Sequence, residues 1–187
     1  MNRMINWKEI NKSWTLFLDR DGVINYEDVG SYITRWEDFR FYEGVLDALK
    51  VFSQRFGHII IVTNQRGVSK RLMSEADLQD IHSQMLGMIE QRGGRVANIY
   101  YCIDLSDESP CRKPNTGMAL EAKRDFPEIE FSRSLMIGNT MNDMIFGKKL
   151  GMKTIFIASN RPAPQLPDAT TDAVFASLHH VSEQMIQ

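Results

Sequence analysis

The chain has 187 residues, a length that fits one domain with a sizeable core. Hydrophobic residues make up 43% of it and charged residues 25%, which is the composition of a globular protein rather than a disordered or collagen-like one. The formal net charge is -2, so the chain has neither a strong basic field for nucleic acid nor an acidic tail. We therefore predict a single domain over residues 1–187, and the charge argues against a nucleic-acid partner.

No stretch of the chain approaches the roughly 20 apolar residues that a membrane span needs. Residues 1–12 lack the apolar core of a signal peptide and instead carry Asn6, Lys8, Glu9 and Asn11. We therefore predict a cytoplasmic protein without a membrane partner. Cys102 and Cys111 are close enough in sequence to pair in an oxidising compartment, but we expect both to be reduced thiols. The sequence does not indicate an oligomeric state.

The first predicted element is a short apolar strand over residues 15–18, followed directly by Asp19-Arg20-Asp21-Gly22. Two carboxylates two residues apart point in roughly the same direction, and the glycine allows the sharp turn that holds them beside a ligand. Like charges this close are costly unless a cation lies between them or one carboxylate is protonated. A metal-assisted nucleophile with its acid or base needs this arrangement. The segment is equally compatible with a plain turn that ends the strand.

A helical apolar face follows over residues 45–56, and Gly57 is expected to end this helix as a C-terminal cap. The next predicted strand, residues 59–62, leads into Thr63, Asn64 and a glycine-containing turn. A hydroxyl, an amide and backbone N–H groups in such a turn can hold phosphate oxygens. Taken alone, this segment is equally compatible with a polar loop at the end of a strand.

Ser74 is expected to cap a second helix, whose apolar residues keep helical spacing until Gly93. A strand over residues 99–102 follows, and after it the chain reads Cys111-Arg112-Lys113-Pro114. Lysine is a compact point charge that suits a phosphoryl group, whereas arginine can make bidentate contacts farther out on a substrate. A charged pair in a loop can equally be solvated surface.

The last polar motif follows a strand predicted over residues 135–137, which comes after a helix over residues 118–126. It reads Gly138-Asn139-Thr140-Met141-Asn142-Asp143, and its amide and carboxylate oxygens are possible ligands for a hard metal ion. Thr140 or Asn142 could equally serve as the cap of a helix expected over residues 142–150.

A strand over residues 154–157 and a helix from Ser177 to the C-terminus complete an alternation of strands and helices. This alternation predicts an α/β fold with an open, mostly parallel, doubly wound (Rossmann-like) sheet and helices on both faces. Ligands of such sheets bind beyond the carboxyl ends of the strands. Four predicted strands each end in groups suited to phosphate or magnesium, so the joint pattern indicates one site.

The segments DRDGVIN, VTNQRGV, CRKPNTGM and IGNTMNDMIFGKKLG resemble the motifs of the haloacid dehalogenase superfamily of phosphatases, which use an aspartate nucleophile. Their details are similar to those of the branch that contains heptose bisphosphate phosphatase and histidinol-phosphate phosphatase. The resemblance spans about residues 16–157. In a chain of this length it implies the doubly wound fold without a large cap domain.

By position, the resemblance implies that Asp19 attacks phosphorus and forms an aspartyl-phosphate. Asp21 would protonate the leaving oxygen and then activate the water that hydrolyses this intermediate. Thr63 and Lys113 would hold the transferring phosphoryl oxygens, and Asp143 would orient Lys113 or metal-bound water. Phosphoryl transfer depends mostly on positioning and charge neutralisation, which these roles provide.

The resemblance also implies a Mg²⁺ site formed by Asp19, the backbone carbonyl of Asp21 and the side chain of Asn139. Family members carry an acidic residue where this chain has Asn139, and an amide offers an oxygen without the charge. We therefore expect weaker Mg²⁺ binding. Asn64 and Arg112, which border the site, are the candidates for substrate contacts.

Relatives in this branch often bind structural zinc through three cysteines and a histidine just before the Arg-Lys-Pro segment. This chain has only Cys102 and Cys111 there, and its four histidines lie elsewhere in the sequence. Two ligands do not make the four-coordinate structural site that zinc favours. We therefore expect no structural zinc, and a shortened loop over residues 103–110 that selects the substrate together with residues 26–41.

These observations predict a Mg²⁺-dependent phosphatase, a phosphoric monoester hydrolase that acts on a small phosphorylated metabolite through an aspartyl-phosphate. A sugar phosphate such as heptose bisphosphate, and histidinol phosphate, are the candidate substrates. Polynucleotide 3′-phosphatase activity is an alternative, because the phosphatase domains of DNA end-repair enzymes resemble the same motifs, although the charge balance argues against it. A non-catalytic phosphate-binding or switch module is a second alternative, which Asn139 keeps open.

Overall fold

The computed structural model describes residues 5–27 and 30–186, and its centre is a six-stranded sheet in which all neighbouring strands are parallel. The strand order is β3-β2-β1-β4-β5-β6, so the chain builds outward from β1 to β3 and then returns to β4 beside β1. The doubly wound sheet expected from the sequence is confirmed, and its order reverses between β1 and β4, where such sheets bind ligands. The strands are β1 (Thr15–Leu18), β2 (His58–Asn64), β3 (Asn98–Cys102), β4 (Ser134–Gly138), β5 (Lys153–Ile157) and β6 (Ala173–Phe175).

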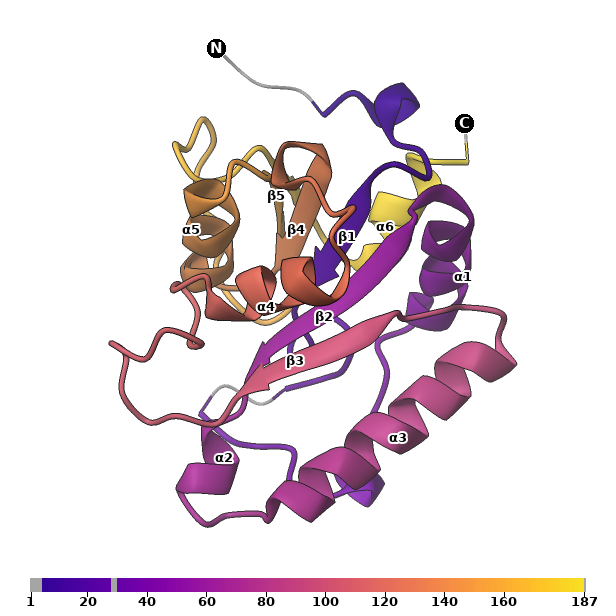
Figure 1. The fold of residues 1–187 in the computed structure, drawn as a ribbon. Helices are drawn as coiled ribbons and strands as arrows, with labels where there is room; N and C mark the ends of the chain where they lie inside the picture. The colour runs from indigo at the N-terminus through magenta and orange to yellow at the C-terminus, as the bar shows by residue number, and fades with distance from the viewer. Residues whose placement is uncertain (1–4, 28–29, 187) are drawn as a thin grey trace.

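Helices cover both faces of the sheet, as expected (Figure 1). Helices α1, α3 and α6 pack on one face, and α4 and α5 pack on the other. Within the described ranges, none of the helices is long and apolar enough to cross a membrane. The helices are α1 (Val45–Arg55), α2 (Arg66–Ser69), α3 (Glu75–Gln91), α4 (Gly117–Asp125), α5 (Met141–Lys149) and α6 (Leu178–Glu183), with 3₁₀ turns η1 (Trp7–Glu9), η2 (Trp36–Asp38) and η3 (Phe131–Arg133).

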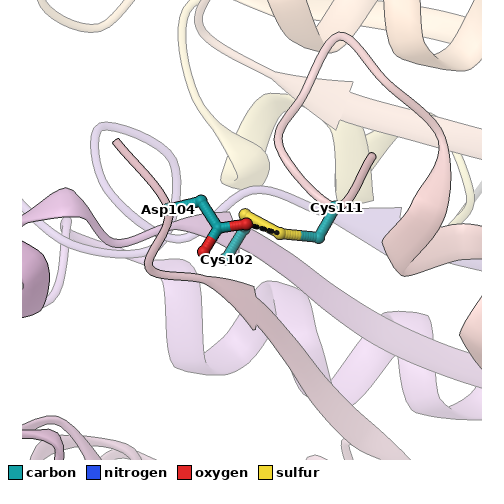
Figure 2. A group of neighbouring side chains, drawn as sticks. All are labelled: Cys102, Asp104 and Cys111. Carbon is teal, nitrogen blue, oxygen red and sulfur yellow. Dashed lines mark hydrogen bonds between the residues drawn. A yellow bond between two sulfur atoms is a disulfide. The ribbon is translucent and has the colours of Figure 1, made fainter. Parts of the chain in front are cut away.

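Cys102 and Cys111 form a disulfide, so the expectation of two reduced thiols is wrong (Figure 2). β3 ends at Cys102, and the following loop turns back until the Cα atoms of the two cysteines lie 5.6 Å apart. That separation lies in the usual range for disulfides, about 4.4–6.8 Å. The sequence shows only how many residues separate the two cysteines, and not that the loop between them closes.

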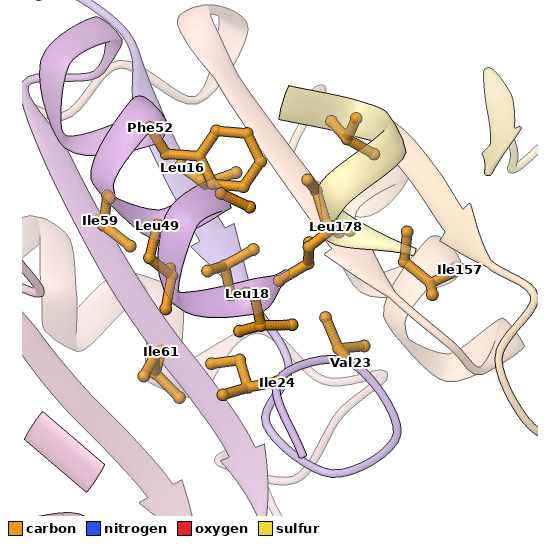
Figure 3. Packing of buried hydrophobic residues seen from close by; sticks show 14 of the residues in the cluster. Leu16, Leu18, Val23, Ile24, Leu49, Phe52, Ile59, Ile61, Ile157 and Leu178 are labelled. Atoms are coloured by element: carbon orange, nitrogen blue, oxygen red, sulfur yellow. The ribbon is translucent and has the colours of Figure 1, made fainter. Parts of the chain in front are cut away.

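Side chains along β1 alternate between the two faces of the sheet. Leu16 and Leu18 pack with Leu49 and Phe52 of α1 on one face (Figure 3). Phe17, between the two leucines, belongs to the cluster on the opposite face, under α4 and α5. All five side chains are fully buried, and burial of each stabilises the fold by about 1.5–3 kcal/mol. Because both faces of β1 are covered, a substrate can reach this part of the sheet only at the strand ends.

Two helix boundaries test the expectations about caps. The Ser74 hydroxyl accepts a hydrogen bond from the Asp77 N–H and the Asp77 carboxylate accepts one from the Ser74 N–H, so the predicted cap of α3 is confirmed. Such a cap is worth about 0.5–2 kcal/mol. The expectation for Gly57 is wrong, because α1 ends before Phe56, which leaves the helix in an extended conformation. Gly57 instead provides space, since a Cβ there would lie 2.3 Å from the Lys12 carbonyl oxygen.

The sequence did not indicate β6 or α2. β6 is a three-residue strand with partly buried side chains, and it follows a proline-containing stretch over residues 161–167. α2 is a four-residue helix where only a turn was expected. Residues 1–4, 28–29 and 187 lie outside the described part, so the structure does not address the parts of the expectations for the N-terminus, the 26–41 loop and the last helix that fall on them.

Candidate active site

The four polar segments found in the sequence meet at one cleft with a volume of about 260 Å³. Asp19 follows β1 and Asn139 follows β4, so the cleft opens where the strand order reverses. The structure therefore brings together all the residues for which the sequence predicted a role. These are Asp19, Asp21, Thr63, Asn64, Arg112, Lys113, Asn139 and Asp143.

The ammonium group of Lys113 connects the acidic residues of the cleft. Its Nζ lies 2.9 Å from Asp19 Oδ1 and 2.6 Å from Asp143 Oδ1, and it donates to the carbonyl oxygen of Val62 at 2.8 Å. The ammonium thus forms one hydrogen bond, to the Val62 carbonyl, and ion pairs with two carboxylates. Burial lowers the pKa of Lys113, but the two carboxylates outweigh burial and hold this pKa above its usual value. The lysine therefore stays charged although only 2% of it is exposed.

The surroundings of Asp19 call for a further cation. Its pKa is raised to about 7, mainly by burial and then by the neighbouring Asp143, while Lys113 acts in the opposite direction. When both carboxylates are ionised, they share a single ammonium group, so one negative charge stays uncompensated. A divalent cation beside Asp19 would compensate that charge and favour the ionised carboxylate.

The carboxylate of Asp21 is held by donors on both oxygens. Arg20 donates to Oδ1 from Nε at 3.1 Å and to both oxygens from Nη2, at 2.8 and 2.9 Å. Asn25 donates to Oδ1 at 2.9 Å, and Gln65 donates to Oδ2 at 2.8 Å. Burial raises the pKa of Asp21, but the Arg20 charge and these hydrogen bonds outweigh burial and lower the pKa. The ionised form of Asp21 is thus favoured in the resting site, and Asp21 must take up a proton before it can donate one.

Arg20 is itself held by His82 of α3, a contact that the sequence analysis missed. Arg20 is fully buried, and its Nη1 lies 3.1 Å from Nε2 of His82. Because a guanidinium can only donate, Nε2 must be the acceptor. Burial and the Arg20 charge lower the pKa of His82 to about 3, which keeps the imidazole neutral. The available signal was a histidine at helical spacing from Leu78, on the apolar face of α3.

The end of β2 supplies two polar residues with different contacts. Thr63 is buried, and its Oγ1 accepts a hydrogen bond from Gln65 at 2.9 Å, which leaves the hydroxyl hydrogen to donate to a phosphate oxygen. Asn64 uses both ends of its amide on Lys113: Nδ2 donates to the Lys113 carbonyl at 3.2 Å and Oδ1 accepts from the Lys113 N–H at 3.1 Å. Asn64 therefore lines the cleft but has the contacts of a residue that positions Lys113.

The end of β4 serves both the following helix and the cleft. Thr140 caps α5, and Asp143 Oδ2 accepts from the Thr140 N–H at 3.0 Å and from its hydroxyl at 2.7 Å. The other oxygen of Asp143 faces Lys113, so capping and site function are not alternatives here. Asn139 is fully buried, and its Oδ1 has no hydrogen-bond partner among the described residues. A buried oxygen without a donor is costly, and it suits a hard metal ion.

Comparison with known proteins identifies the family to which this site belongs. A family model described as polynucleotide kinase 3 phosphatase matches residues 16–182. The chain is 33% identical to D-glycero-alpha-D-manno-heptose-1,7-bisphosphate 7-phosphatase of Mycobacterium bovis, over 88% of this chain and 87% of the relative. It is 32% identical to D-glycero-beta-D-manno-heptose-1,7-bisphosphate 7-phosphatase of Vibrio cholerae, over 92% and 96%. The chain belongs to the haloacid dehalogenase superfamily of phosphatases.

Solved structures are similar to this phosphatase over nearly its whole length. D,D-heptose 1,7-bisphosphate phosphatase from B. bronchiseptica, solved in complex with magnesium and phosphate, has a TM-score of 0.80 and 25% identity, covering 93% of this chain and 98% of its own. A haloacid dehalogenase-like phosphatase from Mesorhizobium loti has a TM-score of 0.75 and 23% identity, covering 94% and 88%. The predicted superfamily, branch and phosphatase activity are confirmed.

Three arginines also line the cleft of this phosphatase, and we call Arg66, Arg112 and Arg161 the arginine rim. Arg66 and Arg112 both pair with Asp107, and Arg161 lies 3.5 Å from Glu27. Each guanidinium keeps one buried nitrogen without a hydrogen-bond partner in the described part of the chain: Nε, Nη1 and Nε respectively. Three positive groups meet two carboxylates, so the rim has an excess of positive charge.

Arg66 and Arg161 are cleft residues to which the sequence analysis assigned no role. Arg66 stands in the segment VTNQRGV, so its place in a phosphate-binding turn was an available signal. Arg161 lies in the loop after β5, where no motif marks it. Only the folded chain brings it into the cleft.

The region where relatives of this phosphatase would bind zinc contains a cluster of Cys102, Asp104 and Cys111 (Figure 2). The possible ligand atoms of these three residues lie within 4.8 Å of one another. The two sulfur atoms are bonded to each other, however, and zinc binds thiolates. The cluster in this form does not fit a zinc ion, and the absence of structural zinc stays a prediction.

Proposed function

We propose that this phosphatase removes one phosphate from a sugar bisphosphate of the heptose bisphosphate class, with Mg²⁺ as its metal ion. The observation that carries the proposal is a single cleft with two separate sets of cationic donors, Lys113 beside Asp19 and the arginine rim. Lys113 would serve the phosphate that is transferred. The rim would hold the phosphate at the other end of the substrate.

The rim is suited to an anion because each of its guanidiniums keeps one nitrogen without an acceptor among the described residues. A buried N–H without a partner costs about 1–3 kcal/mol, so a ligand that provides acceptors is favoured. Arginine binds phosphate with strong, often bidentate, charge-assisted hydrogen bonds. A sugar with one phosphate would pair with Lys113 and leave these three nitrogens without an acceptor. The relatives named above are heptose bisphosphate phosphatases. The second phosphate of a bisphosphate would provide acceptors for the nitrogens of the rim.

In the proposed reaction, Asp19 attacks phosphorus, the bond between phosphorus and the sugar oxygen breaks, and an aspartyl-phosphate forms. Asp21, once protonated, gives its proton to the departing sugar oxygen. Asp21 then takes a proton from a water molecule whose oxygen attacks phosphorus, and inorganic phosphate leaves Asp19. Lys113 and Thr63 donate hydrogen bonds to the phosphoryl oxygens in both steps.

The residues present fit a Mg²⁺ ion, which would be held by Asp19, Asn139 and the backbone carbonyl of Asp21. Asn139 offers an oxygen without a donor, and Asp19 lies in a cluster with an uncompensated negative charge. When bound, the ion supplies neutralisation of the negative charge on the phosphoryl group. Asp143 and Asn64 then act through Lys113, whose position they hold.

The arginine rim also separates this proposal from the other candidate substrates. Histidinol phosphate carries an ammonium group close to its phosphate and an imidazole at its far end, so it offers the rim no second anion and a positive charge that the rim would repel. A polynucleotide 3′-phosphate could place the next backbone phosphate against the rim, and the matching family description names a polynucleotide phosphatase, so it is the second candidate. A switch module would retain its aspartyl-phosphate instead of releasing phosphate repeatedly.

The test is Mg²⁺-dependent phosphate release from heptose 1,7-bisphosphate, heptose 7-phosphate, histidinol phosphate and a 3′-phosphorylated oligonucleotide. We expect kcat/KM for the bisphosphate to exceed that for the monophosphate by at least about tenfold, or about 1.4 kcal/mol. Arg112→Gln and Arg161→Gln should each reduce that preference, whereas Arg133→Gln, an exposed arginine paired with Glu130, should not. Equal kcat/KM for the two sugars would contradict the role of the rim, and faster turnover of the oligonucleotide would favour the second candidate.

A second test addresses the nucleophile. Asp19→Asn should abolish turnover of every substrate, because an amide is a far poorer nucleophile and removes the charge of a metal ligand. The variant should remain folded, since the change is nearly isosteric and reduces the repulsion with Asp143. Ordinary turnover by a folded Asp19→Asn variant would refute the mechanism.

A further inference from the structure

The amide of Asn139 is held at one end only. Its Nδ2 donates to Oδ1 of Asn160 at 3.0 Å, and its Oδ1 is the oxygen without a partner in the described residues. Asn160 lies in the loop after β5, the strand beside β4. Its own Nδ2 donates to the backbone carbonyl of Glu27 at 2.8 Å. A residue 21 positions away in the sequence therefore determines how Asn139 lies.

The orientation of both amides follows from one unambiguous acceptor. The Glu27 carbonyl can only accept a hydrogen bond, so Asn160 must present its NH₂ group to it. The oxygen of Asn160 then faces Asn139, so Asn139 must donate a hydrogen bond to it from its own NH₂ group. The Asn139 oxygen is left on the opposite side of the amide, and both Asn139 and Asp19 line the cleft.

Gly22 lies against the same NH₂ end of this amide. It has a φ of +77°, and a Cβ at this position would lie 1.9 Å from Asn139 Nδ2. A side chain at residue 22 would therefore displace the amide. The Gly22 carbonyl also accepts a hydrogen bond from Ser159, the neighbour of Asn160. The turn after β1 and the loop after β5 thus hold Asn139 between them.

We propose that Asn160 is a positioning residue for the Mg²⁺ site, which holds Nδ2 of Asn139 and so directs Oδ1 of Asn139 toward the metal position. This inference rests on the proposed Mg²⁺ site but not on the identity of the sugar. It gives the loop after β5 a part in metal binding that no motif of the sequence indicated. Groups that orient the ligands of a metal ion commonly change its affinity by 10-fold to 100-fold when they are removed.

The pair is matched to an amide at residue 139. A carboxylate there would place an oxygen, rather than an NH₂ group, against Oδ1 of Asn160. Asn160 could turn to donate to that carboxylate, but its oxygen would then face the Glu27 carbonyl. An aspartate at residue 139 would therefore add a negative charge for the metal ion, but it would also create a repulsive oxygen–oxygen contact, either with Asn160 or between Asn160 and the Glu27 carbonyl. The expected benefit of that charge for Mg²⁺ binding depends on residue 160.

The test measures Mg²⁺ affinity by calorimetry, and Mn²⁺ affinity by electron paramagnetic resonance, with the full chain and no substrate. Asn160→Leu, of similar size but without polar atoms, should weaken binding about tenfold. Asn160→Asp should weaken binding less than Asn160→Leu, because its carboxylate still accepts from Asn139 although it loses the hydrogen bond to the Glu27 carbonyl. The control is Asn98→Leu, at an exposed asparagine that begins β3, which should leave the affinity unchanged.

Two further variants show whether Asn160 acts through Asn139. In an Asn139→Ala background, Asn160→Leu should cause no additional loss of affinity. Asn139→Asp should tighten Mg²⁺ by less than about tenfold alone, and by about tenfold when Asn160→Ser supplies a hydroxyl donor. Wild-type affinity in folded Asn160→Leu, or an equal loss in the Asn139→Ala background, would overturn the inference. A wild-type chain that binds neither ion would instead refute the Mg²⁺ site on which it rests.

Discussion

Asp19 and Asp21 are separated by one residue, yet their surroundings favour opposite protonation states. Burial and Asp143 raise the pKa of Asp19 to about 7, whereas Arg20 and the hydrogen bonds from Asn25 and Gln65 lower the pKa of Asp21 in spite of burial. Pairs of carboxylates whose pKa values are pushed apart commonly divide the roles of a reaction between them. Here Asp19 needs a further cation to be ionised, whereas Asp21 is already paired with the cation of Arg20.

Asp21→Asn tests the second of these roles. Asp19 should still attack an aryl phosphate, whose leaving group departs without a proton, so we expect a loss of less than about tenfold on that substrate. An alkyl phosphate needs the proton, and its turnover should fall by about 10²–10⁴. The measurement is kcat/KM for both esters at saturating Mg²⁺. Equal losses on the two esters would remove Asp21 from the acid role.

The residues at the ends of the predicted strands include the reacting groups but not the side chains that hold those groups in place. Asp19, Thr63 and Asn139 follow apolar runs, and parallel strands bring such ends together whatever the connecting helices are. His82 and Asn160 act from elements 62 and 21 residues away from their partners, through contacts that depend on how those elements pack. A local sequence pattern does not show which distant residues will be in contact, so the roles of His82 and Asn160 can be recognised only in the folded structure.

At the scale of elements, α3 reaches the site through His82. The imidazole accepts from Arg20, which holds Asp21, and its ring lies 5.7 Å from that of Tyr101 on β3. With a pKa of about 3 in the folded state, His82 stays neutral where the unfolded chain, with an ordinary value near 6.5, becomes protonated. The unfolded state therefore binds more protons between about pH 6.5 and 3, and stability falls as the pH falls through that window.

His82→Gln should remove this contribution while keeping an acceptor for Arg20. Between pH 7.5 and 5.5, the wild-type free energy of unfolding should fall by about 1.4 kcal/mol more than that of the variant. Urea unfolding at the two pH values measures the difference. His82→Leu should be less stable than either at pH 7.5, by about 1–3 kcal/mol, because Arg20 loses its acceptor. The same pH dependence in wild type and His82→Gln would show that His82 is not neutral in the folded chain.

The loop between β3 and α4 carries Asp107 to the arginine rim and is closed by the Cys102–Cys111 disulfide. We predict that purified protein holds less than stoichiometric zinc and keeps its fold in a chelator. Even after reduction, the cluster offers only two thiolates and Asp104, one ligand short of a structural zinc site. Elemental analysis of oxidised and reduced protein provides the measurement. One tightly held zinc ion per chain would contradict our interpretation of this loop.

The central strands were predictable from their uninterrupted apolar runs, whereas very short or partly buried elements were not. β1, β2, β4 and β5 are apolar runs buried on both faces, and in a chain of alternating elements such short runs are typical of central parallel strands. β6 has three residues of middling burial, too few to show a period. Gly57 illustrates a different limit, since a glycine beside a helix end suggests a cap, while its neighbour Phe56 shows that the chain has already become extended.

At the scale of the whole molecule, the site is made from loops that leave one continuous sheet. Asp19 and Asn139 follow adjacent central strands, and Lys113 lies before α4, which packs on the same sheet. Both apolar clusters share the residues of β1, with Leu16 in one and Phe17 in the other. We therefore propose that the chain is a single cooperative domain and that the site cannot be altered without affecting the stability of the whole.

This arrangement predicts how Mg²⁺ changes thermal unfolding. The acidic cluster exists only in the folded state, so Mg²⁺ at about 100 times its dissociation constant should stabilise the chain by about 2.7 kcal/mol. For a domain of this size that corresponds to a rise of about 5–11 °C in Tm. The chain should unfold in one transition, with the same Tm by far-ultraviolet and near-ultraviolet circular dichroism. Mg²⁺ should raise the Tm of Asp19→Asn much less than that of the wild type. Two transitions, of which Mg²⁺ moves only one, would mean that the site and the remainder of the sheet unfold separately.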